Sequence, residues 1–291
     1  MNQSNQKLRV VDETAASREL ELVSEIFHRI NRIIPENQDL LIISSKTNVR
    51  DALALMEQHG YSQLPVVDGG EVLGVFSYRS FARRAAAGTI SEIQREKCAP
   101  GDIAVEECLE EFQFARVTDE MRAVFKAMEK DNGLLVGDPG NLQGILTPMD
   151  LLIYLDTVAS PFVMVSEIEL ALRALIRLSV TEEDLVQLSN RTLKQLYGTD
   201  KVPTKLEEMS FDNYIAIISN GDNWARFEPV FGGNRIRTTS NLKEIGEIRN
   251  ALFHFKREIT VQDHRTLTTH RNWLLLKAKQ ADVRIRAGGI S

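Results

Sequence analysis

Hydrophobic and polar positions in the first half of the chain follow two alternating patterns. Over residues 48–60 apolar side chains recur at three- and four-residue spacing, and they do so again over residues 120–133. Each of these segments leads into a short apolar run that ends in a turn, at residues 64–70 and 134–140. The pattern predicts two amphipathic helices, each followed by a buried strand.

A second strand and a second helix start follow each turn. The sequences are G-V-F-S-Y-R-S at residues 74–80 and G-I-L-T-P-M-D at residues 144–150. Short apolar runs at residues 40–43 and 112–117 predict one more strand before each unit. The order strand–helix–strand–strand–helix therefore occurs twice. Since one small sheet buries little apolar surface alone, we expect the two units to pack face to face.

This repeated order, with the strand L-P-V-V-D at residues 64–68 and the turn G-I-L-T-P-M-D, resembles the CBS domain pair, or Bateman module. The resemblance covers residues 38–157, with one repeat at about 38–88 and the other at about 103–157. It implies an α+β module of two β-α-β-β-α repeats.

The turn at residues 147–150 has two readings. Thr147 at the N-cap, Pro148 at the first helical position and Asp150 two residues later form an ordinary helix start. The same geometry suits a phosphate, because a helix N-terminus offers free N–H groups and partial positive charge. The CBS resemblance implies that Thr147 and Asp150 contact the phosphate and ribose of an adenine nucleotide (AMP, ADP or ATP). It adds Gly144 to the motif and places Ile145 and Met149 beside the base.

The first repeat departs from this motif. Ser77 keeps the hydroxyl, but Ser80 stands where the acidic residue belongs. Arg79, Arg83 and Arg84 follow on the same predicted helix, where they either meet phosphates or form a solvated basic face. We therefore expect at most one good nucleotide site, in the second repeat, with Ser77 as the remaining contact of a weak or empty first one.

The flanking segments read as helices. Residues 17–34 carry an apolar stripe that predicts an amphipathic helix within the N-terminal segment 1–37. Strand signals stop after Asp156, and helical patterns follow at residues 163–178, 181–197, 210–219, 241–257 and 261–279. Residues 160–291 are therefore predicted to form an all-α helical bundle.

One of these helices carries E-I-R-N-A-L-F-H-F-K-R at residues 247–257. Arg249 and Asn250 followed by His254 resemble the R-N-x-x-x-H motif of HEPN domains, many of which are metal-independent endoribonucleases. The resemblance implies that these three residues are catalytic, with composite sites across a homodimer. An imidazole can deprotonate a ribose 2′-hydroxyl, and a guanidinium can stabilise charge on phosphate. A helix-surface histidine and a non-catalytic HEPN-like domain remain the alternatives.

The balance of acidic and basic residues also differs between the two halves of the chain. Residues 1–160 hold 16 Lys/Arg against 25 Asp/Glu, whereas residues 226–291 hold 13 against 6, within a net charge of −6. A basic tail around Arg249 favours an anionic partner such as RNA, although a solvated face has the same composition.

Composition removes several classes of protein. Hydrophobic residues at 43% and charged residues at 26% exclude global disorder, and two cysteines are too few for a disulfide framework or a four-ligand zinc site. We expect no metal site. Neither a secretory signal nor an apolar run of about 18 residues is evident in the sequence, so we expect a cytoplasmic protein without a membrane span.

The leading hypothesis is an adenine-nucleotide-sensing regulatory protein whose CBS pair controls a HEPN-type domain that binds or cleaves RNA, with no cofactor required beyond the regulatory nucleotide. One alternative is a non-catalytic nucleotide-binding interaction protein with a HEPN-like dimerisation domain. Another is a component of a defence or toxin–antitoxin system. The particular nucleotide, the RNA target and the sign of regulation stay open.

Overall fold

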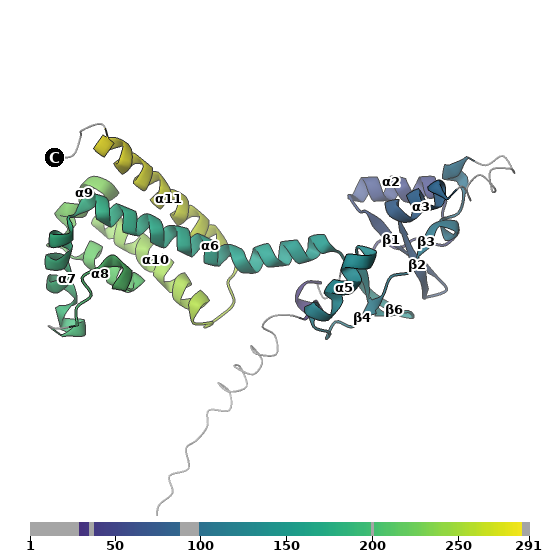
Figure 1. The fold of residues 1–291 in the computed structure, drawn as a ribbon, viewed down its shortest axis with the longest axis horizontal. Coiled ribbons are helices and arrows are strands. Elements are labelled where there is room, and N and C mark those ends of the chain that lie inside the picture. The colour runs from purple at the N-terminus through teal and green to yellow at the C-terminus, as the bar shows by residue number, and fades with distance from the viewer. Residues whose placement is uncertain (1–28, 35–37, 88–98, 199–200, 287–291) are drawn as a thin grey trace, which may run out of the picture. The chain divides into compact units, whose positions relative to one another are not determined.

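The computed structural model describes residues 29–34, 38–87, 99–198 and 201–286. The chain divides into two compact units, unit 1 at Met1–Tyr154 and unit 2 at Leu155–Ser291. The division falls inside one helix, α6 at Pro148–Ser179, which contributes residues to both units (Figure 1).

The described residues of unit 1 form two small three-stranded sheets, each built on an antiparallel hairpin. One has the order β1-β2-β3 and the other the order β4-β5-β6. In both hairpins the register shifts at the same point, between Val66 and Val67 and between Val136 and Gly137. The strands are β1 (Gln63–Asp68), β2 (Glu71–Ser77), β3 (Leu109–Glu110), β4 (Phe114–Ala115), β5 (Leu134–Asp138) and β6 (Asn141–Leu146).

A helix precedes each hairpin, in the segments where the apolar spacing predicts one. These are α2 (Val49–His59) and α5 (Met121–Asp131), while α3 (Tyr78–Ala86) follows the first hairpin. The predicted strand at residues 40–43 is wrong in detail, since only a single parallel bridge joins Ile43 to Val66. Short 3₁₀ turns complete the unit: η1 (Ile30–Arg32), η3 (Pro100–Asp102) and η4 (Val105–Cys108).

The predicted N-terminal helix over residues 17–34 lies mostly outside the described residues. Its described end forms the 3₁₀ turn η1 rather than an α-helix. Ile30 and Ile34 are buried there against the core beneath the second hairpin. Burial of these two side chains attaches the segment before the first repeat to the core of unit 1.

The two sheets share an apolar contact. Val75 of β2, Leu135 of β5 and the intervening Phe112 form one buried cluster. A backbone hydrogen bond of 2.9 Å from the Val72 N–H to the Pro139 carbonyl also joins the two hairpins. Since neither sheet is large enough to enclose a core alone, this shared cluster provides the burial that each one lacks.

The helix α6 corrects two sequence expectations. The helix start at Pro148 and the pattern at residues 163–178 belong to one continuous helix, with Pro161 inside it. An 18-residue window of α6 has a mean hydropathy of 1.5, so by length and composition this helix could cross a membrane. The sequence analysis missed this candidate span because Asp156 interrupts the apolar run. A single such helix is weak evidence for a span, since the core helix of a soluble protein passes the same test.

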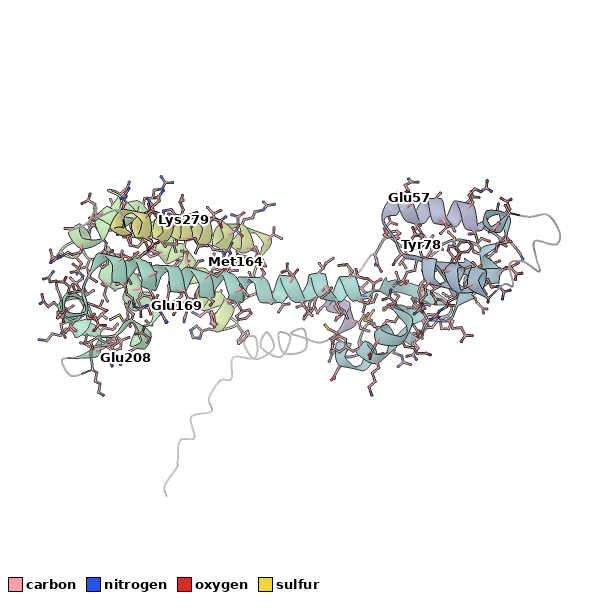
Figure 2. The ribbon with its side chains drawn as sticks, turned by 45° about the horizontal axis from the view of Figure 1, so that its top comes forward. Glu57, Tyr78, Met164, Glu169, Glu208 and Lys279 are labelled. Atoms are coloured by element: carbon pink, nitrogen blue, oxygen red, sulfur yellow. The ribbon has the colours of Figure 1, made fainter. Side chains whose placement is uncertain are left out.

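In the residues that the structure describes, unit 2 consists of helices joined by loops, with no strand. The second half of α6 supplies Ile168, Leu172 and Leu175 to its core, and Glu169 pairs with Arg173 one turn along. Figure 2 labels Glu169 and Met164 on this helix. The other elements are α7 (Glu182–Tyr197), η5 (Leu206–Glu208), α8 (Phe211–Ser219), α9 (Trp224–Phe231), α10 (Arg235–Phe253) and α11 (Val261–Arg286). The sequence patterns miss α9 and displace both ends of α10, which were predicted at residues 241 and 257.

Candidate functional site

Thr147 and Asp150 lie together at the start of α6, as the motif predicts. The Asp150 Oδ2 accepts hydrogen bonds from the Thr147 backbone N–H at 2.7 Å and from the Thr147 hydroxyl at 2.6 Å. The Asp150 N–H lies 3.4 Å from the Thr147 Oγ1. Both side chains are half-buried. They cap the helix in this state, and a ligand phosphate would have to replace the Asp150 carboxylate at the threonine hydroxyl.

Gly144 and Ile145 lie on β6 just before this turn, where Gln38 covers the backbone. The Ile145 N–H donates to the Gln38 Oε1 at 3.1 Å, and the Gln38 Nε2 donates to the Ile145 carbonyl at 3.4 Å. A Cβ on Gly144 would lie 2.9 Å from both the Gln38 Oε1 and the Ile34 Cδ1. The sequence analysis missed Gln38 and Ile34, because no local pattern marks a contact across 107 residues.

The two side chains expected beside a nucleotide base, Ile145 and Met149, lie in different environments. Ile145 packs against the shared cluster of Val75, Phe112 and Leu135, whereas Met149 is 60% exposed. Of these two, Ile145 lies next to the Thr147 turn in a fixed position. Met149 would have to turn toward a ligand to contact it.

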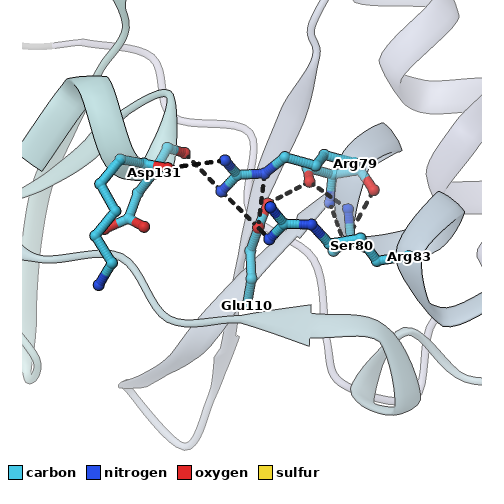
Figure 3. A network of polar contacts seen from close by, with 7 residues as sticks. Arg79, Ser80, Arg83, Glu110 and Asp131 are labelled. Atoms are coloured by element: carbon cyan, nitrogen blue, oxygen red, sulfur yellow. Dashed lines mark hydrogen bonds and ion pairs between the residues drawn. The ribbon is translucent and has the colours of Figure 1, made fainter. Parts of the chain in front are cut away.

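Ser77 occupies the N-cap of α3, the same place after its hairpin that Thr147 occupies after the other. Its Oγ accepts from the Ser80 N–H at 2.9 Å, and the Ser80 hydroxyl completes the capping box. The Ser77 hydroxyl donates to the carboxylate of Glu110, which also pairs with Arg79 (Figure 3). Arg84 instead pairs with Glu107 at 3.1 Å. The N-terminal turn of α3 therefore already binds an acidic side chain, that of Glu110.

The three residues of the R-N-x-x-x-H motif are only partly brought together on α10. The Arg249 guanidinium donates to the Asn250 Oδ1 at 3.2 Å and lies 5.0 Å from the Phe253 ring centroid. The helix ends at Phe253, so His254 is its C-cap, exposed to solvent. The His254 N–H still donates to the Asn250 carbonyl, at 3.2 Å. In the described part of the chain, the His254 side chain makes no hydrogen bond.

An open cavity of about 550 Å³ lies between α8 and α10 and reaches this motif at Asn250. Its floor is apolar at Ile215, Ala216 and Gly246. Its rim is polar, formed by Asp212, Ser219, Thr239, Lys243, Glu247 and Asn250. Neither Arg249 nor His254 lines it. The cavity offers both a basic and two acidic rim groups, so its charge does not select an anion.

Two of the basic side chains expected to attract an anion are already paired. Arg271 pairs with Glu167, and Arg257 pairs with Asp263 at 2.5 Å. The Arg257 guanidinium, with hydrogen bonds from Thr260, holds the pKa of the Asp263 carboxyl well below its usual range. Lys243, Lys256 and Arg265 are exposed. Among the described residues there is no cluster of three or more His, Cys, Asp or Glu that could hold a metal ion.

Unit 1 thus has the β/α fold of a CBS domain: a helix leading into an antiparallel hairpin, which leads into a capped helix. A family model for the CBS domain matches residues 23–87. This match confirms that the N-terminal part of the chain carries a CBS domain.

Several solved structures are similar to part of this chain. An uncharacterized conserved protein from Pyrococcus horikoshii is 26% identical over 43% of this chain and 90% of its own, with a TM-score of 0.36. CBSX2 in complex with AMP is 21% identical over 43% of this chain and 94% of its own, with a TM-score of 0.37. A conserved CBS domain protein of unknown function from Thermoplasma acidophilum is 24% identical over 45% and 70%, with a TM-score of 0.37.

Proposed function

We propose that this chain is a regulatory protein that senses an adenine nucleotide, and that residues 103–157 form a second CBS repeat that binds it. The observation that carries the proposal is the pairing of Thr147 with Asp150 at the first turn of α6. This pairing places a hydroxyl and a carboxylate side by side at a helix N-terminus, where they hold the N–H groups of Thr147 and Asp150. The regulatory nucleotide is AMP, ADP or ATP, and the protein acts in the cytoplasm.

Each group has a distinct task in this proposal. The Thr147 hydroxyl and the N–H groups at the start of α6 bind the phosphate, which the partial positive charge of the helix N-terminus favours. The Asp150 carboxylate, released from Thr147, accepts hydrogen bonds from the two ribose hydroxyls. Gly144 lets the chain pass close to Ile34 and Gln38, and Ile145 and Met149 lie beside the base. No metal is required.

Calorimetric titration with AMP, ADP and ATP tests this site. We expect Asp150→Ala to weaken binding at least tenfold, because a charge-assisted hydrogen bond contributes about 1.5–3 kcal/mol and 1.4 kcal/mol is a factor of ten. Asp138→Ala is the matched control, since Asp138 is exposed at the turn of the same hairpin. Equal affinity of wild type and Asp150→Ala for all three nucleotides would contradict the proposal.

A second function, binding or cleavage of RNA by a HEPN-like unit 2, is favoured by the surroundings of Arg249. Its guanidinium stacks on the exposed Phe253, and its buried Nε has no hydrogen-bond partner. Exposed His254 follows on the same helix end. In this proposal His254 deprotonates a ribose 2′-hydroxyl and Arg249 stabilises the phosphate, with Asn250 holding Arg249, in a homodimer. The alternatives are a non-catalytic unit 2 that serves for dimerisation and docking, and a component of a toxin–antitoxin system.

Incubation of the dimer with total RNA, with and without nucleotide, separates these outcomes. We expect His254→Ala to abolish cleavage, while His264→Ala, on the neighbouring helix α11, leaves it unchanged. RNA retained but uncut by both proteins supports a non-catalytic domain. Equal cleavage by wild type and His254→Ala would remove the catalytic assignment without touching the nucleotide site.

A further inference from the structure

The carboxylate of Glu110 is held by groups that normally bind a phosphate. The Ser77 hydroxyl donates to its Oε1. Its Oε2 accepts from the Arg79 Nε at 3.1 Å and from an Arg79 terminal nitrogen at 2.7 Å, and an Arg83 nitrogen lies 4.0 Å away (Figure 3). The Glu110 side chain is only 13% exposed. One half-buried carboxylate thus lies among a hydroxyl and two guanidinium groups.

The position of this carboxylate is specific to the first hairpin. The Thr147 N–H donates to an acid three residues along, whereas the Ser77 N–H donates to the neutral hydroxyl of Ser80. The acid at Ser77 comes from 33 residues away, on β3, which pairs with β2. A carboxylate and a phosphate both present negative charge and the same kind of acceptor oxygens to an arginine fork.

We propose that Ser77, Arg79 and Arg83 form a binding site for a phosphate group, and that Glu110 closes this site from within the chain. Unit 1 then accepts a phosphorylated ligand at the first turn only when the Glu110 carboxylate withdraws. This anion site is separate from the nucleotide site at Thr147 and does not depend on it.

The site would persist without Glu110, because Arg79 has a second anchor. Its terminal nitrogens donate to the carbonyls of Lys130 and Asp131, each at 3.0 Å. These are the last two residues of α5, where helix carbonyls lack partners within the helix. Arg79 therefore stays in place when the carboxylate is removed, while Arg83, 71% exposed, is free to turn toward an incoming anion.

Neutralising Glu110 while keeping its shape gives the direct test. Calorimetry with inorganic pyrophosphate, AMP and adenosine would compare wild type, Glu110→Gln and the control Glu107→Gln, which removes an acid paired with Arg84 instead. We expect Glu110→Gln to bind pyrophosphate at least tenfold more tightly than wild type. Adenosine should show no gain, because it has no phosphate. A gain for AMP as well as pyrophosphate would identify nucleotide phosphate as an accepted source.

Further variants make each result decisive. Adding Arg83→Gln to Glu110→Gln should abolish the gain, and repeating the titration in an Asp150→Ala background should preserve it, so that failure at Thr147 does not affect this result. If Glu110→Gln does not fold, Glu110→Asp keeps the charge beside Arg79 but shortens its reach to Ser77, and should show a smaller gain. Pyrophosphate affinity equal to wild type in the folded variant overturns the proposal.

Discussion

The carboxylate of Asp150 accepts hydrogen bonds from both the backbone N–H and the hydroxyl of Thr147, at 2.7 and 2.6 Å. This pair serves the start of α6 and, in our proposal, the ligand. The two roles can be tested separately, because the contribution of the cap to stability is measured without ligand.

A double-mutant cycle measures the capping role. We expect Thr147→Val and Asp150→Ala each to lower the free energy of unfolding by about 1 kcal/mol, as loss of a cap does. The double variant should lose less than the sum, since each single change already breaks the hydrogen bond from the Thr147 hydroxyl to the Asp150 carboxylate. Urea unfolding without nucleotide is the measurement. Strict additivity would show that the two side chains act independently.

Gly144→Ala should destabilise unit 1. A Cβ there would lie 2.9 Å from both the Gln38 Oε1 and the Ile34 Cδ1, closer than real Cβ contacts. Both atoms are the ends of side chains that can shift, so we expect a loss of about 1 kcal/mol, the lower end of the usual cost of overpacking, read as a lower Tm. Gly140→Ala is the matched control, because a Cβ at Gly140 would meet no atom within 4 Å. Equal Tm values for the two variants would contradict this packing.

Stability should depend on pH through Asp263. Its pKa is lowered chiefly by the Arg257 guanidinium, and its Oδ2 also accepts from the Thr260 N–H and hydroxyl, each at 2.8 Å. A lowered folded-state pKa stabilises the fold above the unfolded value, about 3.9, and this contribution is lost as pH falls below it. We expect Asp263→Asn to cost about 2 kcal/mol at pH 7 and less at pH 3.

Urea unfolding of wild type and Asp263→Asn at pH 7, 5 and 3 measures this difference. Glu247→Gln serves as the control, because Glu247 is exposed on α10. A difference between wild type and Asp263→Asn that grows toward pH 3 would reverse the expected sign.

Alkaline pH should act through Tyr214. Burial raises the pKa of this phenol, which accepts a hydrogen bond from the Arg173 Nε at 2.8 Å and donates to the Leu206 carbonyl. A raised folded-state pKa gives stability that is complete below the unfolded value, about 10, and is lost as pH rises beyond it. Tyr214→Phe should therefore cost about 1 kcal/mol at pH 8 and less at pH 10.5. Guanidinium chloride unfolding at both pH values tests this prediction. Tyr61→Phe, which changes a more exposed tyrosine, is the control.

Local patterns predicted the elements of unit 1 because they arise from local causes. Helical spacing around Met56 and Met128 follows from one buried face per helix, and α2 and α5 lie in those segments. The Thr147–Asp150 cap depends on residues three apart, so the sequence alone determined it.

The packing of sheets and helices decided the rest. No pattern along the chain indicates that Glu110 meets Ser77, or that Gln38 meets Ile145, because these contacts depend on which strands and turns become neighbours. Nor does helical periodicity show that α10 stops at Phe253, with Phe255 at a positive φ of 50° just beyond. Sequence determined which segments are helices and hairpins and which residues cap them. Tertiary structure decided which charges are already paired, because the partner of a buried charge is chosen by proximity in space.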